Sequence, residues 1–94
     1  MNRTRRQEIL LNARTAVLRH LNDTQISYRK LARIADVSTQ QLYRFLRDPA
    51  ITYGPDEQFY RKLLDLDGNE NLFWDPLTRR LLKMLRDFYK NLGL

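Results

Sequence analysis

Cysteine is absent from this chain of 94 residues, which excludes a disulfide framework and any zinc site built on thiolates. A fold without such cross-links is held by packing alone, and an intracellular protein fits this composition best. No apolar run approaches the roughly 20 residues that a membrane-spanning helix needs. The basic start MNRTRRQEILL is not followed by the apolar stretch of a signal peptide. We therefore expect a cytoplasmic protein with no membrane partner.

The usual parts of an active site are also missing. His20 is the only histidine, so no helix-spaced histidine pair exists to hold a metal, and no glycine-rich phosphate loop is present. The segment DLDGNEN has carboxylates near Gly68 but lacks the D-x-[DN]-x-[DN]-G spacing of a calcium loop. The sequence therefore predicts that the chain is not an enzyme and needs no metal or cofactor. His20 is expected to pack or to stabilise the end of the first helix.

Acidic residues are scarce in the first half of the chain. Residues 1–47 contain ten Lys or Arg and three Asp or Glu, a balance of +7, whereas residues 48–94 contain seven and eight, a balance of −1. A basic surface suits a polyanion, because each cation set against a phosphate releases a condensed counterion. The alternative is a solvated basic surface with no partner.

Apolar residues repeat at helical spacing in five segments, which predicts an all-α fold. The most common domain size is roughly 100–150 residues, so the chain has room for one domain, 1–94, and no second core. The helices expected are about 3–21, 27–35, 38–47, 59–66 and 75–92. Strand signals are weak, and AITY at 50–53 is expected to be no more than briefly extended.

Capping residues mark the ends of several of these helices. Ser27 and Ser38 are expected as N-caps, because a side-chain oxygen there accepts hydrogen bonds from the first free N–H groups. Pro55 is expected to preset the first turn of the fourth helix, and Asp75 to cap the fifth with Pro76 at its first position. Gly68 should end the fourth helix. Residues 57–92 thus complete the core of a compact five-helix domain.

The last helix carries more apolar residues than one narrow stripe can use. Part of this surplus is expected to pair with a second copy in a two-fold homodimer, with 57–92 as the dimerisation part. The alternative is that the first and fourth helices cover both sides of the stripe. Trp74, beside Phe73, is expected to be a core anchor rather than a ligand platform. The expected dimer contacts are Leu81, Leu85, Phe88, Tyr89 and Leu92.

The helical pattern of LARIADVSTQQLYRFL breaks at DVS and restarts at once. A helix, a sharp three-residue turn and a second helix form the unit that places its second helix in the major groove of DNA. Ala32 is small where the two helices pass closely, and Asp36 occupies the turn. The joint between the helices is expected to be filled by Leu31, Ile34, Val37 and Leu42.

This segment resembles the helix-turn-helix of bacterial and phage repressors. RKLA, Val37 and LY at 42–43 are similar to the tetracycline-repressor family, while ADVSTQQLYRFLRDP also resembles the lambda-repressor-like and lactose-repressor-like families. The turn position is usually Gly in these families and is Asp36 here. The tetracycline-repressor family continues into a large ligand-binding domain for which this chain has no room, so no small-molecule ligand is expected.

The resemblance implies which side chains meet double-stranded DNA. Gln can bond the adenine edge in two places and Arg the guanine edge in two places, so Gln40 and Arg44 are the leading candidates for base reading. Phosphate contacts at the edges of the motif would position the protein without reading sequence. The expected base-reading residues are Thr39, Gln40, Gln41, Tyr43 and Arg44. The expected phosphate contacts are Tyr28, Arg29, Lys30, Ser38 and Arg47.

The basic start of the chain offers a further DNA contact. Arg3, Arg5 and Arg6 suggest an arm laid in the minor groove, as in homeodomain-like proteins, and the alternative is a frayed basic terminus. With such an arm, residues 1–47 form the DNA-facing part of the domain.

The function expected from these observations is sequence-specific DNA binding in transcription regulation. The chain is expected to be a plasmid or phage repressor that binds a palindromic operator as a homodimer, with half-sites about one helical turn, near 34 Å, apart. An alternative is an interaction module that binds RNA polymerase or a replication protein through the helix-turn-helix. Single-stranded nucleic acid is a weaker alternative, because the ten aromatic rings fall at inward helical positions.

Overall fold

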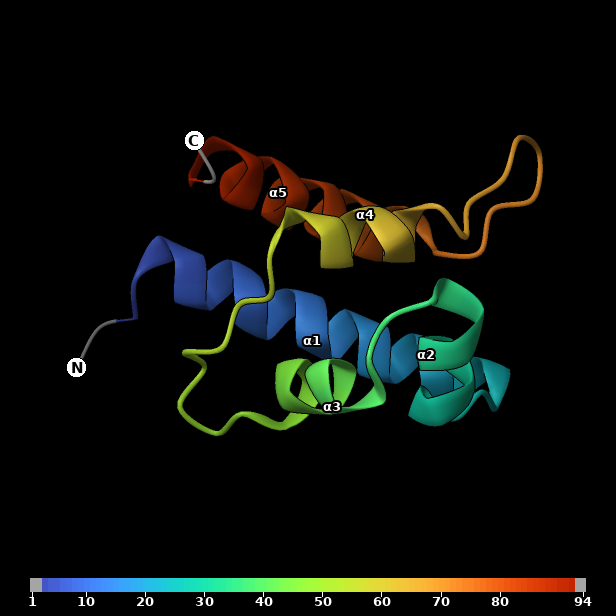
Figure 1. Cartoon of the computed structure of the whole chain (residues 1–94), viewed down its shortest axis with the longest axis horizontal. Coiled ribbons are helices and arrows are strands. Elements are labelled where there is room, and N and C mark those ends of the chain that lie inside the picture. The colour runs from blue at the N-terminus through green and yellow to red at the C-terminus, as the bar shows by residue number, and fades with distance from the viewer. Residues whose placement is uncertain (1–2, 93–94) are drawn as a thin grey trace.

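The computed structural model describes residues 3–92 and folds them into five α-helices, with no strand in that range (Figure 1). The helices are α1 (Arg5–Thr24), α2 (Tyr28–Ala35), α3 (Thr39–Arg47), α4 (Glu57–Leu64) and α5 (Pro76–Leu92). The all-α, five-helix expectation is therefore confirmed. Helix α1 runs about one turn beyond the expected end. Its last three residues, Asn22, Asp23 and Thr24, are exposed.

A capping box begins α1. The Thr4 hydroxyl accepts a hydrogen bond from Gln7 N at 3.1 Å, and the Gln7 side-chain oxygen accepts one from Thr4 N at 2.9 Å. Two otherwise unpaired donors at the start of the helix are satisfied reciprocally. The helix therefore starts firmly at Arg5.

The fourth helix starts at Glu57, two residues after Pro55 and two residues before the start of the expected range 59–66. Asp56 is its N-cap, accepting a hydrogen bond from Phe59 N at 3.1 Å, while Pro55 is buried outside the helix. The helix ends at Leu64, one turn before Gly68. The start of α5 agrees with expectation: Asp75 accepts a hydrogen bond from Thr78 N at 2.7 Å and Pro76 is the first helical residue.

The segment AITY, 50–53, contains no strand, and its first two residues lie in a turn. Ile51 has φ 54°, a left-handed conformation that is unusual for a β-branched residue. The cause is Asp48, whose carboxylate draws the following backbone N–H groups back toward itself. The connection between α3 and α4 is consequently a tight, ordered loop.

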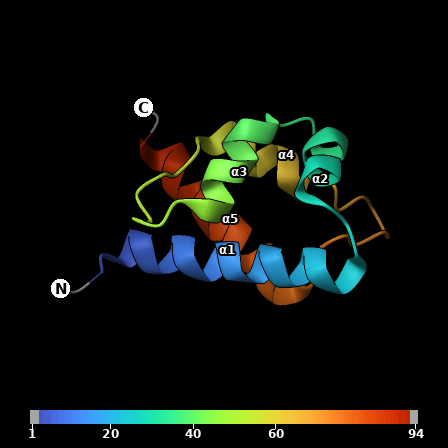
Figure 2. The ribbon, with the colours of Figure 1, turned by 90° about the horizontal axis from the view of Figure 1, so that it is seen from below.

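Helix α1 runs along one side of the molecule, and two helix pairs pack beside it (Figure 1, Figure 2). In Figure 1, α4 and α5 lie above α1, α3 lies below it and α2 lies at its C-terminal end. Figure 2 shows the same long helix along one side of both pairs. Phe45 of α3 meets Phe59 and Tyr60 of α4, with ring centroids 5.4 and 5.9 Å apart, so the two pairs share one core. Side chains of that core with at most 1% exposure include Leu10, Ala13, Val17, Leu31, Leu42, Phe45, Tyr60, Leu63, Leu82 and Leu85.

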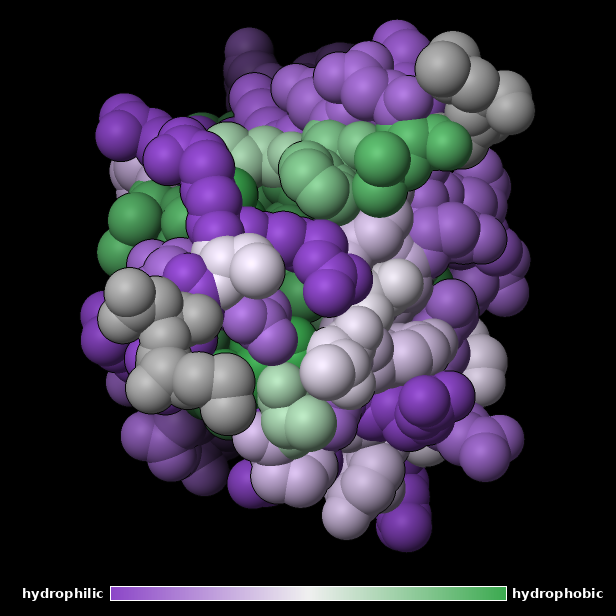
Figure 3. Space-filling view, turned by 90° about the vertical axis from the view of Figure 1, so that its left-hand side faces the viewer, coloured by the Kyte–Doolittle hydropathy of each residue, from purple (hydrophilic) through white to green (hydrophobic). Residues whose placement is uncertain are grey.

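Two of the expected dimer contacts are wrong. Leu81 and Leu85 are buried within the chain, because α1 and α4 both pack against α5. Tyr89 is half-buried and stacks on Tyr60, with ring centroids 5.6 Å apart. Phe88 is also half-buried, and Leu92 is 64% exposed. Figure 3 shows a hydrophobic band near the C-terminal end of α5. At the other end of the helix, Leu77 is 53% exposed.

Trp74 anchors the connection between α4 and α5 in the core. It is 1% exposed, and its indole N–H donates to the carbonyl of Leu63 at 2.8 Å. His20 lies against Phe73 and Trp74, with both ring centroids 4.8 Å away, so it packs rather than stabilising the end of α1, which lies one turn further on. None of the helices in residues 3–92 is both long and apolar enough to span a bilayer.

Candidate nucleic-acid interface

Two short capped helices meet at a left-handed turn. The hydroxyl of Ser27 accepts a hydrogen bond from Lys30 N at 3.1 Å, and that of Ser38 accepts one from Gln41 N at 3.2 Å, so both expected N-caps are confirmed. Asp36 ends α2 with φ 59° and ψ 44°, the conformation for which Gly is the usual choice. An aspartate therefore makes this turn here.

The joint between α2 and α3 contains most of the residues expected there. Leu31, Ala32 and Leu42 are buried, and Val37 is half-buried. The expectation for Ile34 is wrong, because its side chain is 44% exposed. Leu31 and the buried Ala35, four residues apart, occupy the inward stripe of this short helix, and Ile34 falls beside that stripe.

Helix α3 has one buried face and one exposed polar face. Leu42, Phe45 and Leu46 point into the core. All five residues expected to read bases lie on α3, and its outer face is free of carboxylates over these positions. The exposed members are Thr39, Gln40, Tyr43 and Arg44, and Gln41 is half-buried.

The residues expected to contact phosphate flank this face. Arg29, Lys30 and Arg47 are exposed, at the start of α2 and the end of α3. Tyr28 is half-buried and its ring centroid lies 5.6 Å from that of Tyr43, so the start of α2 contacts the middle of α3. A groove of about 370 Å³ between α1, α2 and α3 opens beside these two rings. Ser38 is exposed and serves as the cap of α3.

In the described residues, two of the three cations suggested for an N-terminal arm lie in a helix instead. Arg5 and Arg6 are the first two residues of α1, because the capping box at Thr4 fixes the helical conformation from Arg5 onward. Arg3 lies before the cap, with its guanidinium 3.9 Å from the carboxylate of Glu8. Arg5 and Arg6 therefore belong to the first turn of α1, and Arg3 lies just before it.

Three residues that the sequence did not single out shape this surface. The guanidinium of Arg44 lies 4.1 Å from the ring centroid of Tyr53, which comes from the loop after α3. The loop itself is organised by Asp48, and Lys62 of α4 donates to the carbonyl of Asp36 at 3.0 Å. Asp followed by Pro is a turn signal, so Asp48 was recognisable. No local pattern marks Tyr53 or Lys62, because both act across long distances in sequence.

The charge of this surface is strongly positive. Between residues 25 and 53 the only acidic residues are Asp36 and Asp48. The carboxylate of Asp36 lies 3.6 Å from Lys62 Nζ. Hydrogen bonds from Tyr53 N and, to a smaller extent, Thr52 N lower the pKa of Asp48 to about 2. The backbone N–H groups of the loop therefore stabilise the negative charge of this carboxylate. The cations of the same segment are Arg29, Lys30, Arg33, Arg44 and Arg47.

Comparison of the chain with protein-family models, curated proteins and solved structures gives no match. Residues 3–92 also contain no cluster of three or more His, Asp or Glu side chains that could hold a metal ion. The function is therefore argued from the geometry and charge of α2, α3 and the loop that follows them.

Proposed function

We propose that this chain binds double-stranded DNA in a sequence-specific manner and regulates transcription. The observation that carries the proposal is the exposed face of α3, where Gln40 and Arg44 lie one turn apart. The opposite face of this helix is buried in the core. A capped helix of this kind, set after a second short helix and a tight turn, has the size to enter the major groove.

In this proposal, base reading and positioning use different side chains. Gln40 reads an adenine edge and Arg44 a guanine edge, each by two hydrogen bonds, with Thr39, Gln41 and Tyr43 beside them. Arg29, Lys30 and Arg47 contact phosphates on either side of the groove, and Tyr28 and Ser38 lie close to the same strands. Affinity should then depend steeply on salt, because each phosphate contact releases counterions.

Repression by a homodimer on a palindromic operator is the finer form of this proposal. A two-fold dimer places two copies of α3 about one helical turn, near 34 Å, apart on one side of the duplex. Among the expected dimer contacts, Phe88 and Leu92 remain available, since Leu81 and Leu85 are inside the monomer. Occupation of the operator would block transcription by occlusion.

Selection from a randomised duplex library tests the proposal. The wild-type chain should enrich a defined motif, and binding to that motif should weaken by orders of magnitude between 50 and 200 mM salt, as expected for several phosphate contacts. Gln40→Ala and Arg44→Ala should each relax the preference at one position while the fold is kept. Arg80→Ala, which removes an exposed charge from α5, outside the candidate interface, is the matched control and should retain the motif.

Two outcomes would contradict the proposal. If both α3 variants select the wild-type motif with wild-type affinity, the base-reading residues are misassigned. If the wild-type chain enriches no duplex and binds none in a salt-sensitive way, the chain does not act on duplex DNA. The interaction module for RNA polymerase or a replication protein then becomes the better function.

A further inference from the structure

Arg44 is the one expected base-reading residue whose charged end rests on an aromatic ring. Its guanidinium carbon lies 4.1 Å from the centroid of the Tyr53 ring, close enough for cation–π attraction. Arg44 is otherwise exposed, and Tyr53 is half-buried. A long exposed side chain normally samples many rotamers, so this contact restricts both the position and the plane of the guanidinium.

Tyr53 is itself held in place by the loop that follows α3. The Asp48 carboxylate accepts hydrogen bonds from Ala50 N at 3.1 Å, Thr52 N at 2.8 Å and Tyr53 N at 2.7 Å. The hydroxyl of Thr52 adds a fourth at 2.9 Å. These bonds fold the loop around one side chain at the end of α3, so the backbone of Tyr53 is fixed relative to the helix that carries Arg44.

Two further contacts tie the same loop to the core. Ile51, in its left-handed conformation, is buried with the core residues. Arg14 of α1 donates from its guanidinium to the carbonyl of Asp48 at 2.7 Å. The loop is thus anchored at its start and its middle, and Tyr53 emerges from it against α3.

The pair lines a hollow on the outer face of α3. This hollow has a volume of about 340 Å³ and is lined by Ser38, Gln40, Gln41, Arg44 and Tyr53. Three of these five residues are expected to read bases. Tyr53 therefore forms one wall of the surface that, under the proposed function, faces the groove.

We propose that Tyr53 is a specificity-determining positioning residue, whose ring holds the guanidinium of Arg44 in a fixed plane for bidentate contact with one guanine. The inference rests on the proposed function. A planar fork reads the two guanine acceptors only when it lies in the plane of the base, so a preoriented fork discriminates more strongly than a mobile one. Side chains supported in this way hold the productive geometry before DNA arrives.

The first measurement is made on the free protein and needs no DNA. In NMR spectra, the side-chain protons of Arg44 should show ring-current shifts that persist in Tyr53→Phe and disappear in Tyr53→Leu. Tyr53→Gln, which is polar and suits a half-exposed site, gives a second ring-free variant if Tyr53→Leu does not fold. Unshifted Arg44 protons in the wild-type protein would overturn the inference at once.

The second measurement is selection from the randomised duplex library. Relative to wild type, Tyr53→Leu and Tyr53→Gln should lose about tenfold in preference for guanine at one position, with other positions unchanged. The guanine preference of Tyr53→Phe should stay within about twofold of the wild-type preference. The double variant Tyr53→Leu with Arg44→Ala should lose no more guanine preference than Arg44→Ala alone, because both changes remove the same contact with the base.

The outcomes separate the inference from the function on which it rests. If wild type selects a motif and the ring-free variants keep its guanine preference, Tyr53 does not position Arg44 for reading, and only the inference falls. A uniform loss at every position would assign Tyr53 a purely structural role and would also overturn it. If wild type selects no duplex, the proposed function falls and the inference falls with it.

Discussion

Lys62 of α4 donates a hydrogen bond from Nζ to the backbone carbonyl of Asp36, at 3.0 Å, across 26 residues of sequence. The carbonyls at the end of a helix lack intrahelical partners and need another donor. Lys62 supplies it and also lies 3.6 Å from the Asp36 carboxylate. The turn between the two short helices is thus fastened to the second half of the chain.

Replacement of Lys62 by Met should loosen this turn. Met preserves the length of the side chain but cannot donate, so we expect the free energy of unfolding to fall by about 1 kcal/mol, as for a partly exposed charged hydrogen bond. Lys90→Met, at an exposed position of α5, is the control and should stay within about 0.5 kcal/mol. Urea unfolding measures both, and equal stabilities of the two variants would contradict the role of Lys62.

Two substitutions of Asp36 should have different effects on stability. Asp36→Gly keeps the carbonyl that Lys62 contacts and suits the left-handed backbone, so stability should stay within about 0.5 kcal/mol of wild type or rise. Asp36→Val should lose about 1–2 kcal/mol, because a β-branched side chain is strained at positive φ. Thermal unfolding of the pair checks this, and a Val variant as stable as the Gly variant would rule out the left-handed turn.

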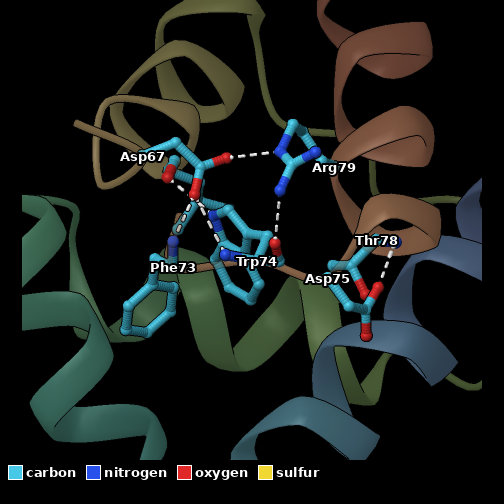
Figure 4. A network of polar contacts seen from close by, with 7 residues as sticks. Asp67, Phe73, Trp74, Asp75, Thr78 and Arg79 are labelled. Carbon is cyan, nitrogen blue, oxygen red and sulfur yellow. Dashed lines mark hydrogen bonds and ion pairs between the residues drawn. The ribbon is translucent and has the colours of Figure 1, made fainter. Parts of the chain in front are cut away.

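Asp67 organises the connection between α4 and α5 (Figure 4). Its carboxylate accepts hydrogen bonds from the backbone N–H groups of Phe73 and Trp74, the latter at 3.0 Å, and from Arg79 Nε at 2.9 Å. The side chains of Asp67 and Arg79 are only 10% and 20% exposed. Arg79 also donates to the carbonyl of Trp74 at 2.7 Å.

Removal of this carboxylate should be costly. In Asp67→Ala, the two backbone N–H groups and the largely buried Arg79 guanidinium lose the carboxylate that accepts their hydrogen bonds. We therefore expect the free energy of unfolding to fall by about 2–4 kcal/mol. Glu70→Ala removes an exposed carboxylate from the same loop and should change stability by less than about 0.5 kcal/mol. Denaturation followed by the fluorescence of Trp74, the only tryptophan, measures both. Similar stabilities would show that the network contributes little.

Gly54 allows a close approach of α5. A Cβ built on Gly54 would collide with the Tyr89 hydroxyl and lie 2.5 Å from its Cζ atom, and the Tyr89 ring is stacked on Tyr60. Gly54→Ala should therefore destabilise the fold by about 1–3 kcal/mol. Gly68 is the matched control, because a Cβ built on it would have no neighbouring atom within 4 Å. The free energy of unfolding of Gly68→Ala should stay within about 0.5 kcal/mol of the wild-type value.

A double-mutant cycle isolates the cause of that cost. In a Tyr89→Ala background, Gly54→Ala should cost at least about 1 kcal/mol less than in wild type, because the colliding ring is gone. The free energies of unfolding of the four proteins give the interaction energy. An interaction energy near zero would mean that Gly54 is required for its backbone and not for contact with Tyr89.

Stability should fall in acid because of two aspartates. Hydrogen bonds from Tyr53 N and Thr52 N lower the pKa of Asp48 to about 2 from 3.8, and one from Thr78 N lowers the pKa of Asp75. Between about pH 4 and pH 2 the unfolded chain then binds more protons than the folded chain. The stabilisation from these two carboxylates is therefore complete above about pH 4 and is lost as the pH falls toward 2. Thermal unfolding from pH 6 to 2 should show this decline.

Asp48→Asn separates one contribution from the rest. The variant should melt below wild type at neutral pH, because an amide replaces one of two acceptor oxygens. The difference in Tm should narrow as the pH falls from about 5 to about 2, since wild type loses its carboxylate there. Asp23→Asn, at an exposed position of α1, is the control. A Tm difference that stays constant with pH would contradict the assignment to Asp48.

The helices, their order and most of their ends follow from local signals. Ser27, Ser38 and Asp75 cap helices where the sequence predicts it, because a capping bond joins residues two or three positions apart. The period of apolar residues likewise identifies which face of α3 is buried. Local bonding also decides the start of α1, where the capping box at Thr4 places Arg5 and Arg6 in the helix rather than in an arm.

What the sequence alone determined is therefore the set of elements and the polar face of α3, since propensity, capping and periodicity act within a few residues. The tertiary structure decided which apolar residues of α5 are covered, that Lys62 supports the turn at Asp36, and that Tyr53 lies against Arg44. These contacts join residues 9–26 positions apart or whole helices. They depend on how the helices pack around α1, and no short-range pattern encodes that arrangement.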